Sequence, residues 1–268
     1  MDRVFIELGP IVIYWYSILI LSAVLIGYNI IVNYCKKINY QTSNIFDMLF
    51  YLVIWAIVGA RIYYVVFNFS AFDNILDIFM IWNGGLAIYG AIIAGIIYIA
   101  YYCFKKKLNF VKVLDIFSLS LLLGQAIGRW GNFFNSEAYG GITTYESLKS
   151  LMLPEFIIKG MYIDGAYRQP TFLYESLWCL IGVVILAFIR RRHSNELGKQ
   201  ICFYLMWYGT GRFFIESLRS DSLYLGDFRV SQIVSIIMVI VGILGTILPK
   251  LRKKGVINKD VGGFDGRI

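Results

Sequence analysis

The chain has 268 residues, of which 59% are hydrophobic and only 16% charged. Its mean hydropathy of +0.67 excludes an ordinary soluble domain, because so much apolar surface cannot be buried in one core. The formal net charge of +8 does not indicate nucleic-acid binding, since the basic residues form short, scattered clusters with no shared face. We therefore expect a membrane protein without a nucleic-acid partner.

Seven apolar segments, most of them long enough to cross a bilayer, follow one another along the chain. They cover residues 11–32, 45–67, 86–104, 111–127, 172–189, 201–215 and 230–248. The segments lack the alternation of strands, and an open sheet cannot satisfy its backbone groups in hydrocarbon. The expected fold class is therefore all-α, a polytopic membrane protein with seven transmembrane helices. The first segment is too long for a signal-peptide core, so we expect it to be retained.

Basic residues cluster in every second connection, which predicts the orientation in the membrane. The clusters lie at residues 36–37, 105–107, 190–192 and 250–254. By the positive-inside rule these connections are cytoplasmic, which places the N-terminus outside and the C-terminus inside. We assign residues 1–250 to the membrane domain and residues 251–268 to a polar cytoplasmic tail, which we expect to be disordered.

Two connections on the outer side are of unusual composition. The longest, at about residues 131–169, has glycine or proline at positions 140, 141, 154, 160 and 165, which break any long helix, and we expect it to form a small extracytoplasmic head. Residues 68–83 mix large apolar and polar side chains, which predicts an amphipathic helix lying in the membrane interface.

Charged residues inside the apolar segments share one depth. Counted from the cytoplasmic ends at about 1.5 Å per helical residue, Arg129 lies roughly 25 Å, Arg61 about 24 Å and Arg212 about 20 Å along its segment. The carboxylates of Glu137, Glu175 and Glu216 fall in the same outer layer. Because each charge in hydrocarbon costs at least about 2.5 to 3.5 kcal/mol, we expect these groups to line one cavity. The alternative is that the arginines extend to lipid headgroups or form static ion pairs.

The ligand of such a cavity is expected to be anionic. With Arg219 included, arginines outnumber the carboxylates predicted near them, which gives the cavity a positive potential. The guanidinium fork matches the oxygen atoms of phosphate, and an outer-leaflet phospholipid carries a phosphate at this depth. An acidic lipid headgroup is therefore the expected ligand.

Familiar catalytic motifs are absent from the sequence. It contains no HExxH, no GxSxG, no P-loop and no paired metal-ligand cluster, and its one histidine, His193, lies in a predicted cytoplasmic connection. We therefore expect neither a metal nor a cofactor. Arginine, glutamate, tyrosine and asparagine remain as the groups that can perform chemistry in the outer cavity.

Several of these residues lie in stretches that resemble one enzyme family. The stretch from residue 128 to 140, GRWGNFFNSEAYG, resembles the signature of the prolipoprotein diacylglyceryl transferases. Further matches, in chain order, are YWYS, GARIYYVVF, WNGGLAIYGAIIAG, RQPTFLYES and YGTGRFFIESLR, so that the resemblance covers about residues 11–248. It implies a multi-pass enzyme of the bacterial plasma membrane whose active site faces the outer leaflet. Its partners would be phosphatidylglycerol and the lipobox of a preprolipoprotein.

The resemblance also implies functional positions in this chain. Those that match the signature are Arg129, Asn132, Glu137 and Gly140, and other matching positions are Tyr16, Arg61, Arg212 and Glu216. Two positions depart from the family pattern, because Tyr89 and Gln169 stand where many members have histidine. No histidine is therefore expected to act as the base. From their neighbourhood we add Asn135 and Arg219 to the residues expected to bind substrate.

The implied reaction transfers a diacylglyceryl group to the lipobox cysteine, forming a thioether and releasing glycerol phosphate. We expect Arg129 and Arg212 to hold the phosphate and stabilise the departing oxygen. Glu137 or Glu216 would accept the thiol proton or orient the arginines, and Tyr89 would bind the lipid, relay a proton or simply pack. The alternative function is a transporter or flippase for an anionic solute or lipid, which a cationic cavity would also serve.

Overall fold

Seven long helices make up most of the part of the chain that the computed structural model describes, residues 3–9, 11–40, 43–69, 72, 74–81, 84–193 and 196–261. They are α1 (Trp15–Lys37), α2 (Ser43–Phe67), α3 (Ile88–Lys105), α4 (Phe110–Asn135), α7 (Thr171–Arg192), α8 (Lys199–Leu218) and α9 (Val230–Val261). All seven predicted segments are therefore helical over most of their length. Six of these helices are long and apolar enough to cross a membrane. The exception, α8, is less apolar because it carries polar side chains that include Arg212 and Glu216.

Short strands, which the all-α prediction did not include, lie between and before the helices. The strands β1 (Val4–Leu8) and β2 (Ile11–Tyr14) form an antiparallel hairpin, so residues 11–14 are not the first turn of a helix as predicted. The run of β-branched and aromatic residues on both sides of Gly9, whose φ is 62°, favours this hairpin over a helix start. A second hairpin, β6 (Tyr224–Leu225) with β7 (Phe228–Arg229), lies between α8 and α9.

The chain divides into two compact units, Met1–Ile31 with Leu114–Ile268 (unit 1) and Val32–Val113 (unit 2). In unit 2, α2 packs against α3, and a 3₁₀ helix, η2 (Ile75–Phe79), lies in the connection between them. The predicted amphipathic helix over residues 68–83 is thus replaced in its described part by short 3₁₀ structure, of which η2 is the longest piece. Residues 70, 71, 73, 82 and 83 lie outside the described residues. The large apolar side chains of η2, Ile75, Leu76 and Phe79, are exposed, as an interfacial segment would have them.

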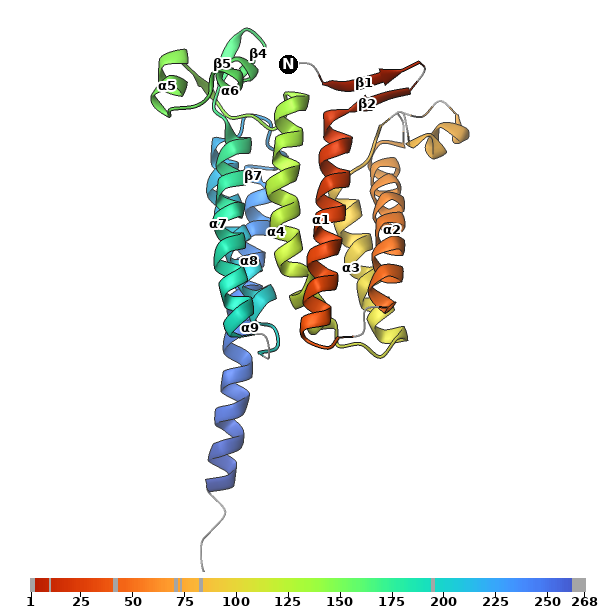
Figure 1. The fold of residues 1–268 in the computed structure, drawn as a ribbon, viewed down its shortest axis with the longest axis vertical. Coiled ribbons are helices and arrows are strands. Elements are labelled where there is room, and N and C mark those ends of the chain that lie inside the picture. The colour runs from red at the N-terminus through yellow and green to blue at the C-terminus, as the bar shows by residue number, and fades with distance from the viewer. Residues whose placement is uncertain are drawn as a thin grey trace, which may run out of the picture. The chain divides into compact units, whose positions relative to one another are not determined.

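The core of unit 1 is formed where α4, α7 and α8 meet (Figure 1). It is built from Leu122 and Ala126 of α4, Cys179 and Leu186 of α7, and Ile201, Cys202 and Tyr204 of α8. Met238 of α9 packs against this cluster, so α9 covers α8 from the other side. The backbone of α9 continues to Val261 and therefore includes part of the predicted polar tail, whose last residues, 262–268, lie outside the described residues.

The predicted head is a small folded element that follows α4 and precedes α7 (Figure 1). It comprises α5 (Tyr145–Ser150), α6 (Glu155–Gly160) and an antiparallel sheet in the order β3 (Ile142–Thr143), β5 (Ala166–Arg168), β4 (Tyr162–Ile163). Its buried residues Leu148, Ile157, Ile158 and Met161 pack on Phe133 of α4 and Phe172 of α7. Because α4 continues to Asn135, the head begins a few residues later than predicted.

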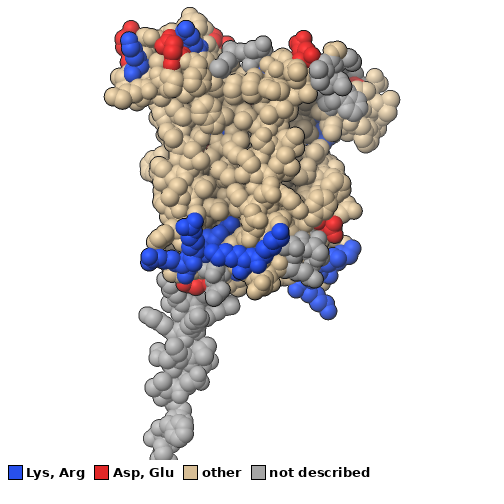
Figure 2. All heavy atoms as spheres, viewed as in Figure 1, with Lys and Arg blue, Asp and Glu red and all other residues tan. Residues whose placement is uncertain are grey.

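The end of unit 1 opposite the head is basic. The last turn of α7 contains Arg190, Arg191 and Arg192, and Figure 2 shows blue side chains gathered at this end, separated from the head by an uncharged surface. The uncharged surface corresponds to the part of the helices that hydrocarbon would cover.

Asp115 of α4 holds the start of α8 at this basic end. Its side chain is fully buried, and its two oxygen atoms accept hydrogen bonds from the backbone N–H groups of Gly198, at 2.7 Å, and Ile201, at 2.8 Å. Arg190 donates to the carbonyls of Asp115 and Ile116, at 3.0 and 2.9 Å. A carboxylate from another helix thus caps the N-terminus of α8.

We expect Asp115→Ala to lower the free energy of unfolding by about 1 to 3 kcal/mol, because two buried N–H groups would lose their acceptor. Thermal unfolding in detergent would measure this, with Asp47→Ala as the control, since Asp47 is exposed. Equal melting temperatures for the two variants would contradict the capping role.

Candidate active site

A single carboxylate, that of Glu175, links three helices near the head end of unit 1. Glu175 lies in the second turn of α7, and its side chain is only 3% exposed. One oxygen, Oε1, lies 2.7 Å from Nη2 of Arg129 on α4, and the other, Oε2, lies 3.0 Å from Nη1 of Arg212 on α8. Two arginines that are 83 positions apart in the sequence are therefore held side by side by one buried charge.

The α8 side of this bridge is extended by residues one helical turn away from Arg212. Tyr208 donates a hydrogen bond of 3.1 Å to Oε1 of Glu175, and its hydroxyl lies 3.5 Å from Arg129 Nη2. Glu216 lies one turn further along, and its Oε2 is 2.6 Å from Nη2 of Arg212. The spacing of four residues in each direction places all three side chains on one face of α8.

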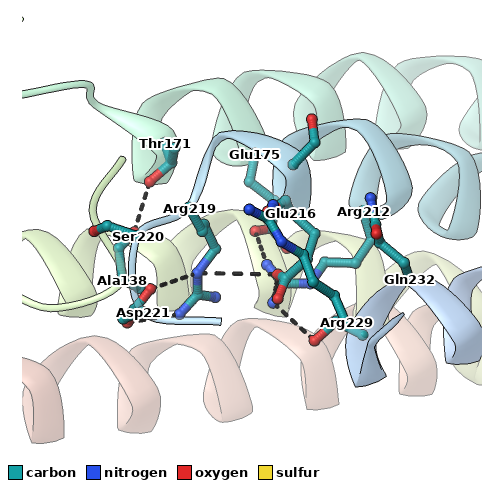
Figure 3. Close-up of polar contacts among 12 residues, drawn as sticks. Ala138, Thr171, Glu175, Arg212, Glu216, Arg219, Ser220, Asp221, Arg229 and Gln232 are labelled. Carbon is teal, nitrogen blue, oxygen red and sulfur yellow. Dashed lines mark hydrogen bonds and ion pairs between the residues drawn. The ribbon is translucent and has the colours of Figure 1, made fainter. Parts of the chain in front are cut away.

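A second layer of charge lies where α8 ends (Figure 3). Arg219 makes two hydrogen bonds of 2.9 Å to the carboxylate of Asp221, and its Nε lies 4.0 Å from Oε2 of Glu216. Arg229, from β7, donates through Nη1 to the backbone carbonyl of Glu216. Arg219 and Arg212 therefore both approach Oε2 of Glu216.

The Arg219 and Asp221 pair lies outside the helices and is ionised at neutral pH. Partial burial raises the pKa of Asp221, but the hydrogen bonds and positive charge of Arg219 more than offset this, so the net pKa lies below its ordinary value. A depressed pKa means that the pair stabilises the folded state above a pH of about 4 and loses this contribution as the pH falls through the folded pKa. Because Asp221 stays charged near neutral pH, its ionisation should not contribute to any pH dependence of the activity there.

On α4, a chain of hydrogen bonds leads from Arg129 toward the head. Arg129 donates through Nη1 to Asn132, at 3.2 Å, and Asn132 donates in turn to Oε1 of Glu137, at 2.9 Å. Asn135 donates to the same oxygen at 3.3 Å. Glu137 is exposed, so the chain ends in a carboxylate that remains accessible.

Tyr16 and Gly140 are held by close contacts in unit 1. The ring of Tyr16 lies against Gly131, where a Cβ atom would be only 2.5 Å from Tyr16 Cδ2. Gly140 is buried, its N–H donates to the carbonyl of Gln169 at 2.9 Å, and it forms an isolated antiparallel bridge with Arg219. Gly140 thus joins the head to the end of α8. Direct contact of Tyr16 or Gly140 with substrate stays a prediction.

Two of the predicted site residues, Arg61 and Tyr89, belong to unit 2. Arg61 is buried, and it donates to five backbone carbonyls, those of Asp77, Ile78, Met80, Gly84 and Gly85, at distances of 2.6 to 3.4 Å. The five N–H groups of its guanidinium are therefore used within unit 2. Tyr89 lies half-buried in the first turn of α3. Their expected roles toward substrate and proton stay predictions.

Three arginines of this cluster are paired with carboxylates. Arg129, Arg212 and Arg219 each have a carboxylate within 4.0 Å, and these carboxylates belong to Glu175, Glu216 and Asp221. Ion pairing, which was the alternative, is thus part of the arrangement.

The arginines are less deeply buried than the carboxylates with which they pair. The side chains of Arg129 and Arg212 are 19% and 13% exposed, whereas those of Glu175 and Glu216 are 3% and 1% exposed. The carboxylates thus lie deeper than the guanidinium groups, and their ion pairs fix the orientation of these groups. Such a pair of oriented donors can bind an anionic oxygen that reaches the exposed part of the two arginine side chains.

Glu175, Tyr208 and Arg229 are site residues that the sequence did not identify as such. Glu175 was placed in the charged layer without a role, although its position in the RQPTFLYES stretch was a usable signal. Tyr208 could have been found from its spacing of four residues before Arg212, which puts both on one helix face. The position of Arg229 gave no comparable signal, because it depends on the β6–β7 hairpin.

Apolar helices that enclose a network of arginine and glutamate define this chain as a multi-pass helical membrane protein with a polar site. The family model described as prolipoprotein diacylglyceryl transferase matches residues 3–248. The chain therefore belongs to the prolipoprotein diacylglyceryl transferase family and is a transferase, which agrees with the resemblance noted in its sequence.

Similar proteins from several bacteria bear one name, phosphatidylglycerol-prolipoprotein diacylglyceryl transferase. The protein from Staphylococcus xylosus is 44% identical, over 97% of this chain and 94% of its own length. That from Halalkalibacterium halodurans is 47% identical, over 91% of this chain and 85% of its own. The protein from Streptococcus uberis is 44% identical, over 95% of this chain and 97% of its own length.

Proposed function

We propose that this chain transfers the diacylglyceryl group of phosphatidylglycerol to the lipobox cysteine thiol of a preprolipoprotein, forming a thioether and releasing glycerol phosphate. The name shared by its relatives supports both substrates. The structural observation that carries the proposal is the pairing of Arg129 and Arg212 on Glu175, in which the arginines are partly exposed and the carboxylate is buried. A transporter or flippase finds no support among the relatives described above.

The proposed setting is the bacterial plasma membrane, crossed seven times, with the N-terminus and head outside and the C-terminus in the cytoplasm. We include α8 as the seventh span, because its polar groups are bonded to α4, α7 and α9 and need not face lipid. The arginines that end α7, opposite the head, support a cytoplasmic location for that end. The active site would then face the outer leaflet.

In the proposed reaction, the thiolate sulfur attacks the glyceryl carbon that bears the phosphate ester. The carbon–oxygen bond breaks, the carbon–sulfur bond forms, and the electron pair leaves with glycerol phosphate. Arg129 and Arg212 would bind the phosphate and stabilise the negative charge that grows on the departing oxygen. Because Glu175 fixes both guanidinium groups in advance, little reorganisation is needed as this charge develops.

The thiol proton needs an acceptor, and the geometry favours Glu137 over Glu216. Glu137 is exposed and bonded to Asn132 and Asn135 through one oxygen, Oε1. Glu216 is buried between Arg212 and Arg219, a position suited to orienting these arginines. We therefore assign proton acceptance to Glu137.

The remaining predicted residues complete the proposed substrate site. Tyr16, Asn132, Asn135, Gly140 and Arg219 would shape it in unit 1. For Arg61 and Tyr89, which belong to unit 2, the roles toward substrate and proton stay separate predictions. In this assignment Gly140 acts through the backbone segments that it joins.

Purified protein in vesicles containing labelled phosphatidylglycerol tests the function. A peptide with a lipobox cysteine should become labelled through a thioether, with equimolar release of glycerol phosphate, while the same peptide with serine in place of cysteine should not. Flux of an anionic solute or lipid across the vesicle membrane without labelled peptide would overturn the proposal in favour of a transporter.

A further inference from the structure

Two tryptophans, Trp178 on α7 and Trp207 on α8, bond to each other reciprocally. The indole Nε1 of Trp178 donates to the backbone carbonyl of Trp207 at 2.9 Å, and Nε1 of Trp207 donates to the carbonyl of Trp178 at 3.0 Å. The two rings are stacked, with centroids 4.4 Å apart and planes inclined by 16°. Each residue is thus donor, acceptor and stacking partner of the other.

A glycine on each helix makes this contact possible. A Cβ atom on Gly182 would lie 2.4 Å from Trp207 Nε1, and one on Gly211 would lie 2.2 Å from Trp178 Nε1. Both glycines follow the tryptophan of their own helix by four residues, so the motif Trp-x-x-x-Gly occurs once on each helix. The interaction is therefore nearly symmetric, which fixes how far one helix can slide or rotate against the other. We call these four residues the indole clasp.

The indole clasp adjoins the residues that hold Arg129 and Arg212. Glu175 precedes Trp178 by three residues on α7, which is about one helical turn. On α8, Tyr208 directly follows Trp207, and Arg212 directly follows Gly211. A shift of α7 against α8 would therefore separate the carboxylate of Glu175 from both of its α8 partners.

We propose that Trp178 and Trp207 are positioning residues for the transferase reaction, because they set the register between α7 and α8 in which Glu175 meets Arg212 and Tyr208. This inference rests on the proposed function. The tryptophans act through Glu175 and have no contact with the reacting atoms. Displacements of about 1 Å in a catalytic group can cost about a hundredfold in rate, so a loss of register should be visible in kcat.

The test uses Trp178→Phe, Trp207→Phe and the double variant, which keep an aromatic ring but lose the N–H donor. Trp55→Phe is the matched control, since Trp55 lies exposed on α2. We expect kcat to fall at least about tenfold in the clasp variants, with little change in KM for phosphatidylglycerol, and Trp55→Phe to retain full activity. Full kcat in the double variant would overturn the positioning role.

A double-mutant cycle separates positioning from a general loss of stability. Glu175→Gln should cost much less in the Trp178→Phe background than in the native chain, because the clasp and the carboxylate act as a unit. If Glu175→Gln lowered kcat by the same factor in the Trp178→Phe background as in the native chain, the link between the clasp and Glu175 would be overturned.

Far-ultraviolet circular dichroism detects the indole clasp without requiring turnover. Two indoles stacked at 4.4 Å should give an exciton couplet that disappears in either single tryptophan variant. A couplet that persists in both single variants would show that Trp178 and Trp207 are not stacked on each other. Absence of transfer by the native chain, with the couplet present, would instead reject the proposed function on which its role depends.

Discussion

Replacing Arg212 or Arg129 by alanine should lower the rate of diacylglyceryl transfer by about 10²- to 10³-fold, the usual cost of losing one donor to a developing negative charge. Each arginine uses part of its guanidinium to bind Glu175 and keeps a second nitrogen for another partner. Arg129→Lys and Arg212→Lys should also be poor, because an ammonium group cannot make both contacts at once.

Transfer of labelled phosphatidylglycerol to a lipobox peptide, per mole of folded protein, measures this effect. Arg191→Lys is the matched control, since Arg191 is exposed in the last turn of α7 and far along that helix from Glu175. Near-native rates in the lysine variants would show that the paired geometry of the guanidinium groups is not needed.

Removal of the Glu175 carboxylate should affect both stability and activity. Glu175→Leu would leave Arg129 and Arg212 without their shared counter-charge, and breaking a buried ion pair in this way typically costs about 3 to 5 kcal/mol. We expect a clear drop in melting temperature and at least about a hundredfold loss of transfer. Glu175→Gln, which keeps the shape but not the charge, should be more stable than Glu175→Leu and still slow.

Thermal unfolding in detergent, together with the transfer assay, measures these two losses. Glu196→Gln serves as the control, because Glu196 is 57% exposed and pairs only at the surface. If Glu175→Leu kept the native melting temperature, Glu175 would not be the buried link between α4, α7 and α8.

The helices could be predicted from the sequence because composition alone decides where a chain can cross hydrocarbon. Counting residues from the basic ends also placed Arg129 and Arg212 at one depth, and their contacts with Glu175 confirm this for unit 1. The β1–β2 hairpin was missed because its apolar residues continue directly into α1, and a short apolar run does not distinguish strand from helix.

The sequence could not show which charged side chains of different helices pair with each other. Depth indicates which charges can meet, but the rotation of each helix decides which of them do, and that depends on packing of the whole core. Thus the sequence did not predict that Glu175 bridges two arginines, nor that Asp221 pairs with Arg219. The five carbonyl contacts of Arg61 depend on the backbone positions of residues 77–80 and 84–85, for which the sequence carried no clear signal.

The most direct test of the central claim is an experimental structure of the protein with phosphatidylglycerol bound. We predict that oxygen atoms of the lipid phosphate lie within about 2.7 to 2.9 Å of guanidinium nitrogens of both Arg129 and Arg212, with Glu175 still behind them. A phosphate bound away from both arginines, or guanidinium groups that point apart into lipid, would contradict the account.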